Sequence, residues 1–204
     1  MKELPKMPAD NAHPFPLWLR VTHWLNALAM LVMITSGWRI YNASPLFNFN
    51  FPDVFTLGGW LGGALQWHFA AMWLLVLNGA FYLTATIATG RLRRMYWPLS
   101  FQGLVTDVVK TLTGRLSHSN LSQYNMIQKL AYLLVILTGI IAVLSGLAVW
   151  KSVQFPLLRE LFGGYEGARL VHFICMSLIV LFIAIHLLMV VLVPKTLIAM
   201  IRGR

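Results

Sequence analysis

The sequence predicts an all-α integral membrane protein, a bundle of four transmembrane helices with both termini in the cytoplasm. Three observations lead to this prediction. The 204 residues are 58% hydrophobic and only 11% charged, a composition typical of membrane proteins rather than of soluble domains. Four apolar segments are each long enough to cross a bilayer as a helix. Basic residues gather in the segments that would lie on one side of the membrane.

We expect the spans at about residues 17–37, 60–88, 127–150 and 170–193, within a single membrane domain that comprises residues 1–204. Of the 16 Lys and Arg residues, only Arg39, Lys151, Arg159 and Arg169 then fall on the outer side. This asymmetry is the positive-inside pattern, so the net charge of +10 is explained by orientation and by contact with anionic lipid. We expect no nucleic-acid partner.

The connections between the spans carry further signals. The inner connection comprises residues 91–126, and within it residues 101–112 show a helical period of apolar side chains, which predicts a short amphipathic helix on the inner membrane surface. The opening 16 residues lack an apolar core, so we expect a cytoplasmic lead-in rather than a signal peptide. The outer connections are rich in phenylalanine, at Phe47, Phe49, Phe51, Phe55, Phe155 and Phe162. Such exposed apolar side chains indicate a docking surface, with packing against lipid as the alternative.

Four histidines lie inside the predicted spans, and their depths pair them. His172 and His186 lie in the last span, fourteen positions apart. On a helix they share one face within about 40° and are separated by roughly 21 Å along the axis. His68 lies near the outer end of the second span, level with His172. His23 lies near the inner end of the first span, level with His186. The chain therefore offers two imidazoles at each of two levels.

Two imidazoles at one level are the axial ligand set of a haem iron. We therefore expect the bundle to enclose two haems b, an inner one between His23 and His186 and an outer one between His68 and His172. Zinc or haem-free iron would require further carboxylate or thiolate ligands at each level. The single cysteine, Cys175, excludes an iron–sulfur cluster built from this chain alone. Hydrogen-bonded interior histidines or a proton path are the alternatives. His13 and His118 lie in polar segments, where we expect them to be solvated.

Glycines at matching depths fit the same prediction. Gly37 follows His23 by fourteen positions and would face the outer haem, whereas Gly79 would clear space for the inner one. In the third span, Gly139 and Gly146 would let a bulky group approach the helix. Ordinary packing between helices explains any single glycine equally well.

Two arginines each precede a histidine by one helical turn, Arg20 before His23 and Arg169 before His172. Each guanidinium would reach the membrane rim while the histidine faces inward, and a fixed cation there suits a haem propionate. Arginines that extend to the interface from an apolar helix are the alternative explanation.

The chain resembles the bacterial cytochrome b561 and nickel–iron hydrogenase b-type cytochrome family. The resemblance rests on the R-x-x-H-W pattern of Arg20, His23 and Trp24, on the early histidine of the second span and on the H-x13-H of the fourth. It covers nearly all of the chain. It implies a multi-pass, four-helix dihaem module of the bacterial inner membrane that passes electrons between a quinone and another redox protein.

A second resemblance concerns the start of the third span. The N-x-x-Q-K pattern of Asn125, Gln128 and Lys129 is similar to one in the cytochrome b subunits of membrane formate dehydrogenases, where this region borders the quinone pocket. Those relatives commonly have glycine where this chain has Ile127. The resemblance implies that Asn125, Gln128 and Lys129 bind quinone. Helix capping by Asn125 and an interfacial Lys129 are the alternative.

Together these features predict an electron-transfer subunit that connects a periplasmic molybdenum oxidoreductase or hydrogenase with the quinone pool. The chain holds no substrate domain of its own, which favours such a partner. A standalone quinone-coupled oxidase of a small oxidant such as superoxide is the enzymatic alternative. A four-helix transporter or assembly protein without haem is the alternative from another class.

Overall fold

The structure is a computed structural model, and it describes residues 15–113 and 125–203. The beginning of the predicted lead-in, with His13, and residues 114–124 of the inner connection, with His118, lie outside the described residues. Within the described part, all regular elements are helical. They are α1 (Leu17–Ala43), the 3-10 turn η1 (Asp53–Phe55), α2 (Leu61–Ala88), α3 (Arg91–Tyr96), α4 (Phe101–Leu112), α5 (Met126–Trp150), α6 (Pro156–Leu161), α7 (Gly164–Leu192) and α8 (Pro194–Arg202).

Four of these helices, α1, α2, α5 and α7, are long and apolar enough to cross a membrane. They confirm the predicted all-α membrane fold, and two of them are longer than expected. Helix α1 continues to Ala43, because Arg39 and Asn42 in its last turn hold the following loop through hydrogen bonds to Asp53 and Phe51. Helix α7 begins at Gly164, and its first turns are supported by an ion pair between Glu166 and Arg169, three positions apart.

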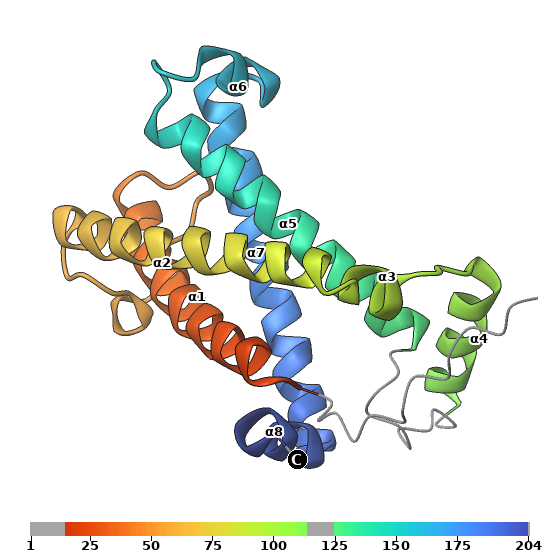
Figure 1. Ribbon diagram of the computed structural model, residues 1–204. Helices are drawn as coiled ribbons and strands as arrows, with labels where there is room; N and C mark the ends of the chain where they lie inside the picture. Colours follow the sequence, from red (N-terminus) through yellow and green to blue (C-terminus); the bar gives the residue numbers. More distant parts are fainter. Residues whose placement is uncertain (1–14, 114–124, 204) are drawn as a thin grey trace, which may run out of the picture.

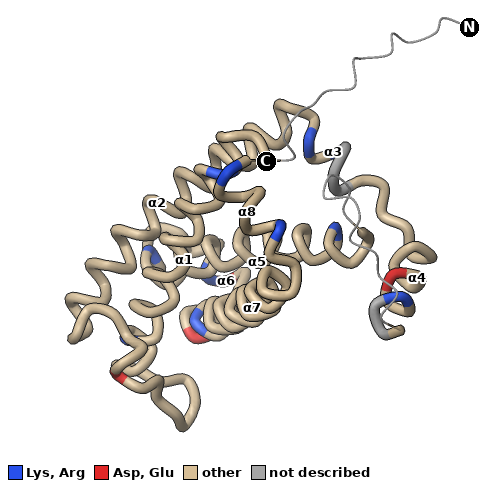
Figure 2. The backbone as a smooth tube through the Cα atoms, turned by 90° about the horizontal axis from the view of Figure 1, so that it is seen from below, with Lys and Arg blue, Asp and Glu red and all other residues tan. Residues whose placement is uncertain are grey.

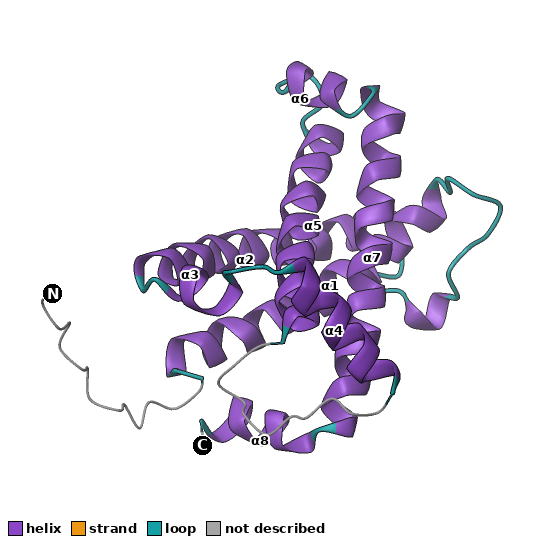
Figure 3. Cartoon of the chain, turned by 90° about the vertical axis from the view of Figure 1, so that its right-hand side faces the viewer, coloured by secondary structure: helices purple, strands orange, loops and turns teal. Residues whose placement is uncertain are grey.

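The four spans form two tightly packed helix pairs. Helix α1 packs along α2, and α5 packs along α7, whereas contacts between the two pairs are few. Helices α5 and α7 run side by side, and the pair formed by α1 and α2 crosses them (Figure 1, Figure 3). A bundle of this kind leaves space between its two halves, and that space contains the candidate site.

The short helices α3, α4 and α8 lie away from the two outer connections (Figure 1). Lys and Arg residues mark these three helices (Figure 2), which fits the inner side assigned from the charge pattern. Helix α4 covers the same residues as the amphipathic helix predicted from sequence. Its Asp107 carboxylate accepts a hydrogen bond of 2.7 Å from the backbone N–H of Met126, the first residue of α5, so α4 is attached to the start of that span.

Helix α8 was not predicted. It begins with Pro194 at its first position, where the missing N–H costs no hydrogen bond. Ala199 of α8 packs against Phe15 and Leu19 at the start of α1. Helices α3 and α6 were also not predicted, and each has only 6 residues.

Candidate functional site

A large, mostly apolar cavity lies between the two helix pairs. Its volume is about 1590 Å³, and residues of all four spans line it. Pockets for small molecules typically have about 300–1,000 Å³, so this space can hold a macrocycle and a further ligand. The polar residues on its lining include His23, Asn26, Arg91, Asn125, Gln128 and His186.

The inner histidines face each other across this cavity. The ring centroids of His23, on α1, and His186, on α7, are 6.0 Å apart. Trp24 meets the His23 ring edge-on, and Phe182 stacks on the His186 ring with centroids 6.0 Å apart. An aromatic side chain thus packs against each of the two imidazoles.

The outer histidines form a second pair. The ring centroids of His68, on α2, and His172, on α7, are 6.4 Å apart. Both rings are hydrogen-bonded through Nδ1, His68 to the Ser36 hydroxyl and His172 to the Ala142 carbonyl and the Ser145 hydroxyl. The structure therefore brings together the same two pairs that the depths of the histidines suggest.

The spacing of both pairs fits a haem iron between them. An imidazole nitrogen binds a metal at about 2 Å, so two rings on opposite sides of one ion have centroids about 6 Å apart. Among the described residues, no group of three or more His, Cys, Asp or Glu side chains could hold a metal ion. Two imidazoles without further protein ligands suit an iron whose remaining positions are filled by a macrocycle. The donor set and the spacing therefore fit haem better than a bare ion.

The glycines divide into two groups by their surroundings. Gly79 and Gly139 line the large cavity, and a Cβ added at either position would meet nothing within 4 Å. A Cβ at Gly37 would lie 3.5 Å from Cε1 of His68, which is ordinary van der Waals contact. A Cβ at Gly146 would lie only 2.9 Å from Cε1 of His172. Two glycines therefore border open space at the cavity, and two border the outer imidazoles.

The two arginines bind protein oxygens at the ends of the spans. Arg20 donates hydrogen bonds to the carbonyls of Met200 and Ile201, which lie in the last turn of α8 and lack partners within that helix. Arg169 binds the Glu166 carboxylate and the Ser44 carbonyl and hydroxyl. Neither arginine lines the cavity. Their contact with haem propionates stays a prediction, and the structure shows them fastening α8 and the outer loop.

Of the three residues predicted to bind quinone, two line the cavity and one does not. Asn125 and Gln128 line the cavity and form a capping box at the start of α5. The Asn125 side-chain oxygen accepts from the Gln128 N–H at 2.8 Å, and the Gln128 side-chain oxygen accepts from the Asn125 N–H at 3.2 Å. Lys129 lies outside the cavity lining, and its Nζ is 3.5 Å from the Pro98 carbonyl. Helix capping by Asn125 was the alternative to quinone binding that the sequence suggested, and this capping is present in the structure.

Comparison with known proteins decides the family. A family profile described as prokaryotic cytochrome b561 matches residues 14–203. The chain belongs to this family. It is also 61% identical, over 188 residues, to a protein of Azospira oryzae named putative protein-methionine-sulfoxide reductase subunit YedZ1. The alignment covers 92% of this chain and 95% of the relative. No solved structure matches the chain.

Membership confirms the resemblance that the histidine motifs indicated. The protein is a multi-pass cytochrome of the bacterial inner membrane that serves electron transfer, and its cofactor is b-type haem. A transporter or assembly protein without haem is thereby set aside.

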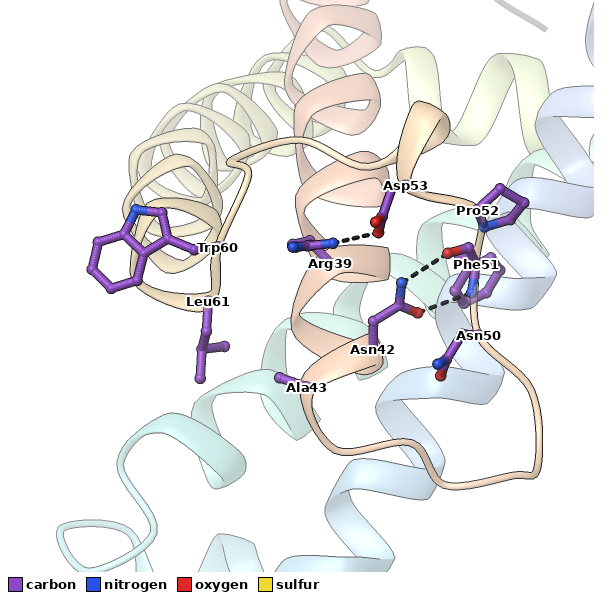
Figure 4. Close-up of a pocket in the computed structure, with 9 residues that line it drawn as sticks. All are labelled: Arg39, Asn42, Ala43, Asn50, Phe51, Pro52, Asp53, Trp60 and Leu61. Atoms are coloured by element: carbon purple, nitrogen blue, oxygen red, sulfur yellow. Dashed lines mark hydrogen bonds and ion pairs between the residues drawn. The ribbon is translucent and has the colours of Figure 1, made fainter.

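The loop at the outer end of α1 contains a smaller pocket of about 590 Å³ (Figure 4). Its polar side chains bind one another and the loop itself. Arg39 pairs with Asp53 and also donates to the Gly59 carbonyl. The Asn42 amide bonds both the N–H and the carbonyl of Phe51, at 2.9 and 2.8 Å. We interpret this pocket as the frame of the outer loop.

An aromatic cluster joins this loop of the cytochrome to α7. Phe47, Phe49 and Phe51 pack around Tyr41, and Phe173, which follows the outer ligand candidate His172, stacks on Tyr41 with centroids 5.1 Å apart. Phe47 and Phe49 remain about half exposed. Three of the phenylalanines that sequence suggested as a docking surface are thus also part of the aromatic cluster that contacts Phe173 of α7.

Proposed function

We propose that this cytochrome passes electrons between the quinone pool and a periplasmic molybdenum oxidoreductase through two bis-histidine haems b. The observation that carries the proposal is the presence of two imidazole pairs with ring centroids 6.0 and 6.4 Å apart, each joining α7 to a helix of the other pair. His23 and His186 also line the large cavity. His23 and His186 would hold the inner haem, and His68 and His172 the outer one. When bound, the haems would supply one-electron transfer.

The relative's name supports a reductase as the partner. It is called a putative subunit of a protein-methionine-sulfoxide reductase, so we infer that the present cytochrome delivers electrons outward to an enzyme that reduces methionine sulfoxide. A subunit of this kind needs a quinol donor at the inner end and a docked acceptor at the outer end. The same name favours a reductase over a hydrogenase, and a subunit over a standalone superoxide oxidase.

The capping box provides the chemistry expected of a quinone site. Both side-chain oxygens are engaged in capping α5. Among the described residues, no hydrogen bond engages the amide nitrogens of Asn125 or Gln128. Each amide can therefore donate to a quinone carbonyl in the cavity that the two residues line together with His23 and His186. One residue pair can thus cap the helix and bind the quinone through different atoms.

This division of atoms allows a test that separates the two roles. Asn125→Ser and Gln128→Glu retain capping oxygens, because Ser and Glu form the same box, but they remove the amide N–H donors. We expect about fivefold slower reduction of the haems by a quinol analogue, since one lost hydrogen bond weakens binding by about 1 kcal/mol. Thermal stability and haem content should match those of the parent protein.

The control for this test is Lys110→Gln on α4, because Lys110 lies outside the cavity lining and should leave the quinol rate unchanged. Stopped-flow reduction of the haems measures the rate in each variant. Parental rates in both Asn125→Ser and Gln128→Glu would place the quinone elsewhere in the cavity.

The outer surface offers a docking site that is apolar rather than charged. The acidic groups Asp53, Glu160 and Glu166 each pair with an arginine there, so little net charge remains for steering a partner. Large apolar side chains stay exposed on η1 and α6, namely Val54, Phe55, Leu157 and Leu161. We propose that the reductase docks on this surface, which we call the outer apolar face.

Replacing Leu157 and Leu161 of α6 together with serine should weaken binding of the partner at least tenfold, because buried apolar anchors carry most of the energy of such interfaces. Neither residue lines the large cavity, whereas Phe55 does. Haem spectra should stay unchanged, and binding should depend little on salt. The control is Phe101→Ser, an equally exposed residue on α4 at the opposite side. Co-purification with the reductase measures the effect, and undiminished recovery from the double variant would refute the docking site.

A further inference from the structure

Each outer histidine rests against a Ser-Gly dipeptide of a neighbouring helix. Ser36 and Gly37 of α1 contact His68, and Ser145 and Gly146 of α5 contact His172. Both serines are completely buried, with 0% of their surface exposed. The two arrangements use the same residue types in the same order, although they belong to different helices.

The serine hydroxyls are oriented by their own helices. Ser36 donates to the Val32 carbonyl at 2.6 Å, and Ser145 donates to the Ile141 carbonyl at 2.7 Å. A hydroxyl has one hydrogen, so each oxygen then presents only lone pairs to the imidazole. The Ser36 oxygen lies 3.0 Å from Nδ1 of His68, and the Ser145 oxygen lies 3.3 Å from Nδ1 of His172.

Backbone groups three residues before each serine strengthen this pattern. The Ala142 carbonyl is 2.9 Å from Nδ1 of His172, and the Ser36 hydroxyl also lies 3.3 Å from the Met33 carbonyl. A carbonyl can only accept, so Nδ1 carries the hydrogen of the neutral imidazole. Nε2 then has a free lone pair, and this is the nitrogen on the side away from the Ser-Gly dipeptide. The surroundings thus fix the tautomer that a metal ligand requires.

The inner pair is different. Within the described part of the chain, His23 and His186 make ring contacts, and no hydrogen bond to either imidazole occurs there. The two levels of the bundle therefore hold chemically similar histidines in distinct environments.

We propose that Ser36 and Ser145 are positioning residues that tune the outer haem, an inference that rests on the dihaem function proposed above. A hydrogen-bond acceptor at Nδ1–H makes an imidazole a more basic ligand. A more basic ligand donates more electron density to the iron and favours the ferric state. The Ser-Gly dipeptides thus lower the reduction potential of the outer haem, which makes it a stronger electron donor to a docked reductase.

Redox titration of the purified cytochrome tests this inference. The outer haem is identified as the one that His172→Ala removes. In Ser36→Ala, we expect its ferric–ferrous equilibrium to shift about tenfold toward the ferrous form, which for one electron is a rise of about 59 mV. In Ser145→Ala, we expect a smaller rise, because the Ala142 carbonyl, 2.9 Å from Nδ1 of His172, remains as an acceptor. The inner haem should keep its potential, and the EPR spectrum should still show bis-imidazole iron. Ser177→Ala is the control, because Ser177 on α7 bonds only the Phe173 carbonyl.

Ser36→Thr and Ser145→Thr retain a hydroxyl and should restore the parental potential. Complete loss of the outer haem from an alanine variant is a separate outcome. In that case, a threonine variant at the same position that retains the outer haem supports the inference, and a threonine variant that also loses the outer haem contradicts the inference. Alanine variants that keep both haems with an unchanged outer potential overturn the inference. A parent protein without two bis-imidazole haems instead overturns the proposed function.

Discussion

Replacement of His172 by alanine should remove the outer haem and leave the inner haem spectrally unchanged. His68→Ala should give the same result, because either substitution leaves one axial ligand where two are required. His23→Ala and His186→Ala should remove the inner haem instead. We expect nearly complete loss of one haem in each case, seen as the disappearance of one of two low-spin signals in low-temperature optical and EPR spectra.

Each histidine pair is the control for the other in this experiment. The pairing follows from topology, because α7 carries an imidazole at both levels while α1 and α2 each carry one. Loss of the same signal from the His23 and His172 variants would show that the assignment of the histidines to an inner and an outer level is wrong. The quinone assignment, which depends on the inner level, would then also fail.

The second large effect is expected at Gly146. A Cβ there would lie 2.9 Å from Cε1 of His172, and the ring cannot retreat freely because the Ala142 carbonyl holds its Nδ1 at 2.9 Å. Gly146→Ala should therefore misplace the ligand and reduce the affinity for the outer haem at least tenfold, as loss of supporting contacts does at other metal sites. Haem content after purification, with the spectrum of the remaining haem, measures this effect.

Gly37→Ala is the matched comparison, since its Cβ would make only an ordinary contact of 3.5 Å with His68. It should retain both haems. Full outer-haem occupancy in Gly146→Ala would contradict the close packing of α5 against His172.

The spans and the histidine pairs could be predicted from sequence for a physical reason. A helix in a bilayer must satisfy its own backbone hydrogen bonds, so a long apolar segment has essentially one regular geometry. Depth and facing direction then follow from residue number alone. This is why the spacing of His172 and His186 could suggest partners on α1 and α2 before any contact was known.

Other contacts could not be predicted, because they depend on how separate helices are placed against one another. Arg20 binds carbonyls about 180 positions further along the chain, and it does so only because α8 folds back against α1. The Ser-Gly dipeptides were visible in the sequence, but their contact with His68 and His172 depends on the register of α1 against α2 and of α5 against α7.

The start of α5 could be predicted from sequence in part. The N-x-x-Q pattern at Asn125 and Gln128 suggested both a cap and a quinone site, and the structure shows the cap. Sequence could not show that the caps use both side-chain oxygens and that, among the described residues, both amide nitrogens stay out of hydrogen bonds. That division is a property of side-chain geometry, and it permits both functions at one position.

The most direct test of the central claim is the number and ligation of haems in the purified parent protein. Pyridine haemochrome analysis against protein concentration gives the number of haems b per chain, and EPR of the oxidised protein reports their axial ligands. We expect two haems b per chain and two distinct low-spin bis-imidazole signals. A single haem per chain, or a signal that reveals an axial ligand other than imidazole, would contradict the proposed dihaem electron-transfer path.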